Sequence, residues 1–175
     1  MGKNEINMEK FIADVIANIE AVKDNTPSNT NSLKPWTIAI KKALVDVAEK
    51  HGLLINCKIG EEYKHNEDVG WLYDAIIYSR NNEIFDEVYL VCESEWGNDS
   101  DIELDFEKLL FARAKVRLMV YAVAEKSYDE YYEKLTNIIE KSNSCLKGDV
   151  FLFAIWKYAE PEEFKVVQYI KKGNT

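Results

Sequence analysis

Three carboxylates stand inside segments whose other residues are typical of buried strands. Asp74 lies in the apolar run from 71 to 79, and Glu93 and Glu95 lie two residues apart at the end of the run from 87 to 95. Alternate residues of a strand project to the same face, so we expect Glu93 and Glu95 to point the same way. A fully buried, unpaired carboxylate costs several kcal/mol, which predicts a charged partner or a cation for each of them.

The turn-like sequence Ser79-Arg-Asn-Asn82 separates the two runs and predicts an antiparallel hairpin. Asp74 and Glu93 lie at comparable distances from that turn, so we expect them to converge with Glu95. Carboxylates held this close favour a hard divalent cation such as Mg²⁺ or Mn²⁺. The alternative is that Asp74 is a paired structural residue, and that the two glutamates are solvated or paired with Lys or Arg.

The following helix offers two cations that could serve a phosphate. Leu104, Lys108 and Lys115 fall on nearly one line at 3.6 residues per turn, so both ammonium groups could lean toward the sheet. A lysine beside a scissile phosphate can stabilise the charge that develops during hydrolysis. Alternatively, Lys108 extends to solvent or pairs with Asp105 three residues earlier.

The elements that must position these residues follow from hydrophobic periodicity. A period of 3.6 predicts four helices and a period near 2 predicts the strands, in the order α, α, β, β, β, α, β, α, β, β. The fold class is therefore a mixed α/β sheet flanked by helices, with the first three strands as an antiparallel meander. The expected helices cover residues 7–23, 35–51, 99–114 and 128–139, and the expected strands cover 53–59, 71–79, 87–95, 116–123, 149–158 and 163–171.

Residues 35 to 123, with Asp74 on the second strand and Glu93-Ser-Glu95 on the third, resemble the core of the PD-(D/E)XK nuclease-like proteins, which include type II restriction endonucleases. The resemblance implies a restriction-endonuclease-like core, α-β-β-β-α-β, to which this chain adds an N-terminal helix and a C-terminal β-hairpin. It also implies that Asp74 and Glu93 bind Mg²⁺ (or Mn²⁺), with help from the carbonyl group of Ser94.

The chain departs from this family pattern at two positions. Glu95 occupies the position of the family lysine, so Lys108 is the expected substitute and Lys115 the second choice; Tyr73 occupies the position of the family proline. An acidic residue late in the first core helix often assists in the family, and Glu49 matches it better than Asp46, which is flanked by lysines. The resemblance makes Asp74, Glu93, Glu95 and Lys108 the expected catalytic set.

Composition bounds the possible functions. The 175 residues suit one domain, 1–175, and the net charge of −9 argues against whole-surface attraction to nucleic acid. The three cysteines are widely spaced, which predicts reduced, buried thiols. The sequence contains no stretch long and apolar enough for a signal peptide or a membrane span, so we expect a cytoplasmic protein without membrane association.

Two functions remain open. The first is a metal-dependent nuclease, or nuclease-like protein, that hydrolyses phosphodiester bonds in restriction, defence or repair, with DNA as the expected partner and RNA left open. The second is a catalytically inactive binding module of the same fold. In that case the aromatic residues of the C-terminal half could cover a partner or homodimer surface, because aromatic residues are favoured at interface centres.

Overall fold

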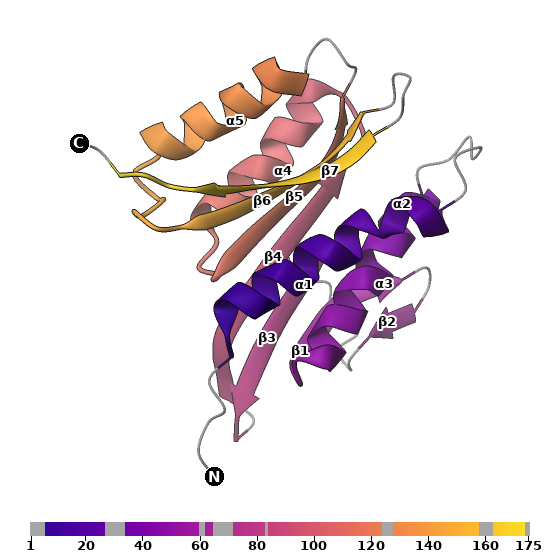
Figure 1. The fold of residues 1–175 in the computed structure, drawn as a ribbon. Helices are drawn as coiled ribbons and strands as arrows, with labels where there is room; N and C mark the ends of the chain where they lie inside the picture. Colours follow the sequence, from indigo (N-terminus) through magenta and orange to yellow (C-terminus); the bar gives the residue numbers. More distant parts are fainter. Residues whose placement is uncertain are drawn as a thin grey trace.

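A computed structural model describes residues 6–26, 34–59, 62–64, 72–82, 84–123, 128–157 and 163–173. The described residues form a seven-stranded mixed sheet in the order β2-β1-β3-β4-β5-β6-β7, with helices on both faces (Figure 1). The helices are α1 (Met8–Glu20), α2 (Val22–Asn25), α3 (Lys34–Lys50), α4 (Asp99–Phe111) and α5 (Tyr128–Lys141). The strands are β1 (Leu54–Ile59), β2 (Glu62–Lys64), β3 (Ala75–Asn81), β4 (Ile84–Glu95), β5 (Val116–Val123), β6 (Val150–Lys157) and β7 (Glu163–Ile170).

The expected α/β class and element order are confirmed. Strands β1, β3 and β4 form the predicted antiparallel meander, and β6 pairs with β7 as the predicted antiparallel hairpin. The short strand β2, which pairs with β1, was not expected. Helix α3 ends before Gly52, whose φ of +65° suits a residue without a Cβ atom at a helix C-terminus.

Strand β4 is the middle strand and changes the direction of the sheet. It is antiparallel to β3 on one side and parallel to β5 on the other. Helices α4 and α5 make the crossovers from β4 to β5 and from β5 to β6, and both cover the same face of the sheet (Figure 1). Ligand sites of open α/β sheets form at the carboxyl ends of strands where the topology reverses, so the end of β4 is a natural site.

Two apolar clusters fill the layers on either side of the sheet. One lies under α1 and α3 and includes Leu44, Cys57 and Cys92, and the other lies under α4 and α5 and includes Val91 and Phe106. All three cysteines are buried and free, as expected. No helix of the described residues is long and apolar enough to cross a membrane.

Helix α4 is shorter than the sequence predicts. It ends at Phe111 rather than at residue 114, and Leu104 and Phe111 are exposed, so the helix is buried on one face only. Its start is fixed by Asn98, whose side chain accepts hydrogen bonds from the backbone N–H groups of Ser100 and Asp101. This start sets which residues of α4 face the sheet.

Candidate functional site

Asp74 lies immediately before β3, in a bend rather than on the strand as predicted. The ladder between β3 and β4 ends at the pair Ala75 and Cys92, so no strand of the described residues pairs with Ser94 on that side. The Asp74 side chain takes the place of the missing strand: its Oδ2 atom accepts hydrogen bonds from Ser94 N at 2.9 Å and from Ser94 Oγ at 2.8 Å. Asp74 is thereby fixed against the carboxyl end of β4.

The second oxygen of Asp74 is held by helix α3. Lys41 Nζ donates a hydrogen bond to Asp74 Oδ1 at 2.9 Å, and the Lys41 residue is buried. Burial alone would raise the pKa of Asp74, but the hydrogen bond and charge of Lys41, with the two hydrogen bonds from Ser94, outweigh it and lower that pKa. Asp74 is therefore ionised at neutral pH.

Glu93 is paired with helix α4. Its side chain is only 3% exposed, and Lys108 Nζ lies 2.9 Å from Glu93 Oε1 and 2.7 Å from Asp105 Oδ1. Burial raises the pKa of Glu93 to about 7, because Lys108 offsets only part of the desolvation and the nearby charges of Asp74 and Asp105 raise the pKa further. Burial lowers the pKa of Lys108, but its two carboxylate partners prevail and raise it.

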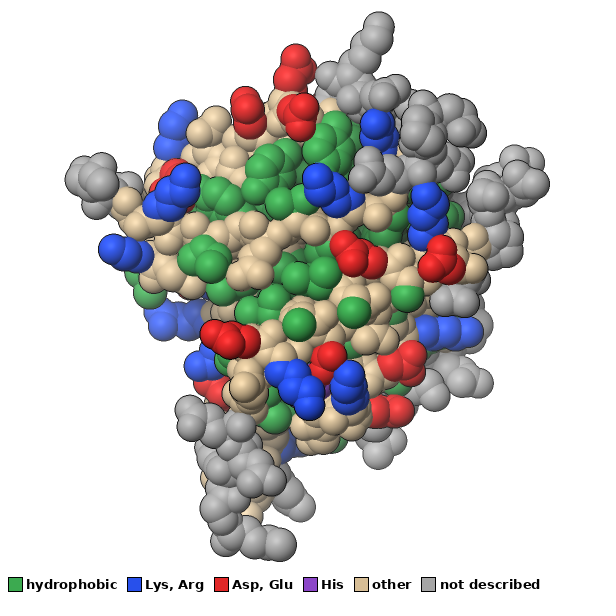
Figure 2. All heavy atoms as spheres, in the orientation of Figure 1, with side chains coloured by type: hydrophobic (Ala, Val, Ile, Leu, Met, Phe, Trp, Pro, Cys, Tyr) green, Lys and Arg blue, Asp and Glu red, His purple; other side chains and the backbone are tan. Residues whose placement is uncertain are grey.

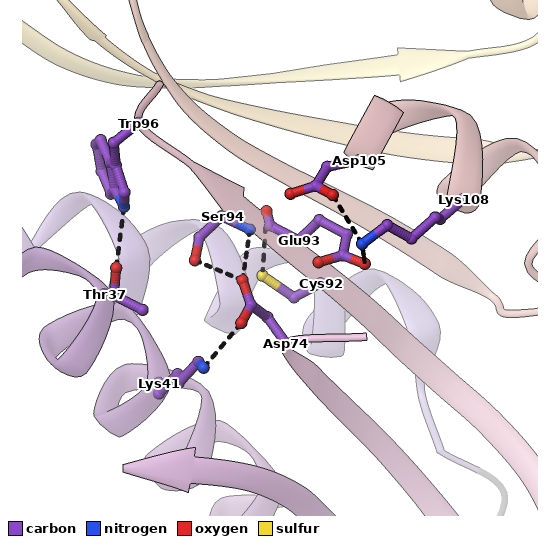
Figure 3. Close-up of polar contacts among 9 residues, drawn as sticks. All are labelled: Thr37, Lys41, Asp74, Cys92, Glu93, Ser94, Trp96, Asp105 and Lys108. Carbon is purple, nitrogen blue, oxygen red and sulfur yellow. Dashed lines mark hydrogen bonds and ion pairs between the residues drawn. The ribbon is translucent and has the colours of Figure 1, made fainter. Parts of the chain in front are cut away.

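Asp74 and Glu93 thus flank the end of β4 from two sides of the sheet. Figure 3 shows Asp74 turned toward Lys41 and Ser94, while Lys108 lies between the carboxylates of Glu93 and Asp105 and contacts both. The alternation along β4 agrees, because Cys92 belongs to the cluster under α3 and Val91 to the cluster under α4. The two carboxylates nevertheless interact, since the charge of Asp74 contributes to the raised pKa of Glu93.

Glu95 does not join the other two carboxylates. Its Oε1 atom accepts hydrogen bonds from the backbone N–H groups of Trp96 at 2.8 Å and of Gly97 at 2.6 Å, so it closes the turn into α4. A Cβ atom at Gly97 would lie 2.8 Å from Glu95 Oε1 and 2.8 Å from Asp101 Oδ2, which explains why the smallest residue stands there. The expected convergence of three carboxylates is therefore wrong.

Trp96 packs against two other tryptophan side chains. Its ring centroid lies 6.2 Å from that of Trp36 and 6.1 Å from that of Trp156, and its Nε1 atom donates to Thr37 Oγ1 at 3.0 Å. These contacts favour a packing role for Trp96 over stacking on a base.

The other expected residues lie elsewhere. Glu49 is exposed and stands eight residues beyond Lys41 on α3, which is about 12 Å along the helix axis, so the structure does not bring it to Asp74. Lys115 follows the end of α4 and pairs with Glu87 at 2.6 Å, so it does not accompany Lys108. Lys108 was expected either to lean toward the sheet or to pair with Asp105, and it does both, because it contacts Glu93 and also Asp105.

Sequence reasoning missed the role of Lys41. The sequence patterns did not single out Lys41, yet its Nζ atom contacts Asp74 Oδ1 at 2.9 Å. A signal was present: Ala48 lies seven residues further on, or two helical turns, and Val45 lies four further on, and both are buried. Lys41 therefore shares its direction with apolar residues that face the core.

A divalent cation fits this site only in part. Among the described residues, no group of three or more His, Cys, Asp or Glu side chains could hold a metal ion. However, Mg²⁺ is commonly held by only one or two carboxylates together with substrate phosphates. Glu93 Oε1 is buried and meets Lys108 Nζ at 2.9 Å, so a cation bound at this oxygen would have to displace Lys108.

Charge on the described surface is mixed. Figure 2 shows acidic and basic side chains interspersed on the face formed by α1 and β7, with hydrophobic side chains between them. The described residues on that face show no broad basic region of the kind that tracks a nucleic-acid backbone.

Comparisons with known proteins add little to this geometry. No protein-family model matches the chain, and no curated protein matches it. A solved structure described as NucC of E. coli MS115-1 in its cAAA-bound form aligns over 96% of this chain and 85% of its own, with 8% identity and a TM-score of 0.41. At that TM-score the likeness carries no argument about function.

Proposed function

We propose that the chain is a metal-dependent nuclease of the restriction-endonuclease-like type, which hydrolyses phosphodiester bonds at the carboxyl end of β4. One observation carries the proposal: Asp74 and Glu93 flank Ser94 at this end, and Lys108 from the next helix contacts Glu93 at 2.9 Å. A buried carboxylate whose pKa remains near 7 beside a lysine is poorly stabilised in the fold, and such groups gather at functional sites.

Asp74 and Glu93 would hold Mg²⁺ or Mn²⁺, together with the carbonyl group of Ser94 and oxygens of the substrate. Because the two carboxylates lie on two sides of the sheet and are paired with Lys41 and Lys108, both side chains would have to leave these partners and turn toward the end of β4. When bound, the cation would neutralise charge on the phosphate and lower the pKa of a water molecule. The residues of the chain supply the rest. Among the described residues, Lys41 and Lys108 bring two ammonium groups to the site. Lys41 pairs with Asp74 and Lys108 pairs with Glu93, the two carboxylates that would bind the cation.

This arrangement predicts an exchange of partners when substrate binds. A phosphate group would offer Lys41 and Lys108 new anionic partners, and the two lysines would then leave the carboxylates of Asp74 and Glu93 available to hold a cation. Lys108 keeps Asp105 at 2.7 Å throughout, so it stays oriented toward the site and can stabilise charge on the phosphate. We assign this role to Lys108 rather than to Glu95, because Glu95 Oε1 already accepts two backbone hydrogen bonds.

A catalytically inactive binding module is the second candidate, and a specific observation favours it. Both carboxylates of the site are paired with lysines, and such pairs can be purely structural. The mixed surface charge of Figure 2 points the same way, because it offers no broad basic track for a nucleic acid on that described face.

A cleavage assay separates the two candidates. Labelled single- and double-stranded DNA and RNA would be incubated with the chain in Mg²⁺, Mn²⁺ or EDTA. We expect metal-dependent cleavage that falls by at least about 100-fold in Asp74→Asn and Glu93→Gln, while Glu49→Gln, a matched loss of an exposed acid, retains it. Nucleic-acid binding without cleavage would identify the module, and cleavage that survives both variants would refute the assignment of the site.

A further inference from the structure

A second site lies at the other end of β4. A cavity of about 660 Å³ is formed by the first residues of β4, the segment after α4 and the segment between α5 and β6. This volume falls in the range of small-molecule sites, roughly 300–1,000 Å³. From Glu93 to Val88, which lines the cavity, is about 16 Å along the strand, so the cavity is distinct from the proposed nuclease site.

A buried arginine stands in the wall of this cavity. Arg117 is 4% exposed, and its Nε and Nη2 atoms donate to the carbonyl oxygen of Ala112 at 3.1 and 2.7 Å. Its guanidinium carbon lies 5.1 Å from the centroid of the Phe151 ring, and Nη2 is 3.2 Å from Asp149 Oδ2. The Nη1 atom is buried and has no hydrogen-bond partner within the described part of the chain.

Among the other charged groups of the wall, the carboxylates already have partners, whereas N–H donors of arginine remain without an acceptor within the described ranges. The wall has three acidic residues, and each has a partner. Asp86 Oδ2 accepts a hydrogen bond from Ser79 Oγ at 3.4 Å, and Glu87 pairs with Lys115 at 2.6 Å. Asp149 Oδ2 accepts from the backbone N–H of Leu146 at 2.8 Å and also contacts Arg117. Arg113 is exposed in the same wall and makes no ion pair with a described residue. An anion therefore suits the cavity better than a cation.

The rim of the cavity is apolar. Phe111 is 71% exposed, Leu146 is 66% exposed and Phe85 is 37% exposed, and all three line the opening. Large side chains held in water around one cavity are characteristic of a surface that covers a ligand. Exposed rings also offer flat faces on which a planar group can lie.

We propose that this cavity binds a small organic anion, in which a phosphate or carboxylate group is joined to a flat apolar body. The oxyanion would meet the guanidinium groups of Arg117 and Arg113, and the apolar body would lie against Phe111 and its neighbours on the rim. Arginine suits this task because its planar fork matches the geometry of both oxyanions.

The test uses the full chain labelled with ¹⁵N and phenyl phosphate as the probe. We expect saturable chemical-shift changes at residues 111–117 and 143–149, with a Kd of about 1 mM or tighter. Inorganic phosphate lacks the apolar body and phenol lacks the oxyanion, so each should bind at least about tenfold more weakly than phenyl phosphate. Benzoate in a parallel titration distinguishes a carboxylate ligand from a phosphate ligand.

Variants locate the site. Phe111→Ala and Arg113→Gln change exposed side chains, so they should fold, and each should weaken phenyl phosphate binding about tenfold. Leu104→Ala, an exposed apolar residue of α4 outside the cavity, and Lys10→Gln, an equal loss of charge on α1, should leave the Kd unchanged. No saturable shifts at the cavity, or a Kd insensitive to Phe111→Ala and Arg113→Gln, would overturn the proposal.

Discussion

Replacing Glu93 by glutamine should make the protein more stable at alkaline pH. The pKa of Glu93 is raised from its ordinary value of 4.5 to about 7 in the folded protein. The folded state therefore binds a proton more tightly than the unfolded state, and the free energy of unfolding must fall as the pH rises between these two values. Glutamine keeps the shape of the side chain and has no proton to lose.

The size of the effect follows from the same values. At 1.36 kcal/mol per pH unit, the difference between 4.5 and about 7 corresponds to about 3 kcal/mol, of which about 2–3 kcal/mol develops between pH 5 and 8. Loss of the Lys108 ion pair subtracts little, because Lys108 is one-third exposed and keeps Asp105. We expect Glu93→Gln to match the wild type near pH 5 and to exceed it in stability near pH 8.

Urea unfolding followed by tryptophan fluorescence, at several values of pH from 5 to 8.5, measures this difference directly. Asp74 has a lowered pKa and Lys108 a raised one, so both titrate outside this window. Glu49→Gln, which removes an exposed carboxylate by the same chemical change, is measured in parallel as the control. A flat difference for Glu93→Gln, or a variant less stable than the wild type at pH 8, would refute the reasoning about burial.

Four further outcomes follow from the contacts of the site. Asp74→Asn removes the anionic partner of the buried Lys41, so urea unfolding should show a loss of about 2 kcal/mol. Because the pKa of Asp74 is lowered in the fold, its ionised form stabilises the protein above its ordinary pKa, and this stabilisation should disappear as the pH falls below about 4. In an acid titration the wild type should lose this part of its stability, and Asp74→Asn should not. Glu95→Ala deprives two backbone donors of their acceptor and should cost about 1–2 kcal/mol, measured by thermal unfolding. Gly97→Ala should cost a similar amount in the same assay and should not add fully to Glu95→Ala, since its Cβ atom meets the Glu95 carboxylate at 2.8 Å.

The sequence predicted the architecture well because periodicity reports burial directly. The strand expected at 116–123 is β5, whose residues are almost all buried, and the C-terminal hairpin has nearly the expected bounds. Strand β2 has only three residues, which is too short for a period-2 pattern to be recognised. The end of α4 was placed too late because the apolar residues Ala112 and Ala114 continue the helical pattern beyond Phe111.

The site was harder to predict because it depends on where elements end. Sequence reasoning placed Asp74 on a strand, and β3 in fact begins one residue later, which frees its side chain to reach Lys41 and Ser94. Glu95 stands on the same face of β4 as Glu93, but two free N–H groups of the next turn bind it. Which donors reach the Glu95 carboxylate depends on tertiary geometry, which a single sequence does not contain.

The most direct test of the proposed site is Mn²⁺ binding, measured by electron paramagnetic resonance with and without a phosphorothioate oligonucleotide that resists cleavage. We expect one bound ion, tighter when the oligonucleotide is present, and a loss of affinity of about 10- to 100-fold in both Asp74→Asn and Glu93→Gln, with Glu49→Gln unchanged. Equal Mn²⁺ affinity in the wild type and in the two site variants would contradict the assignment of Asp74 and Glu93 as ligands of one cation.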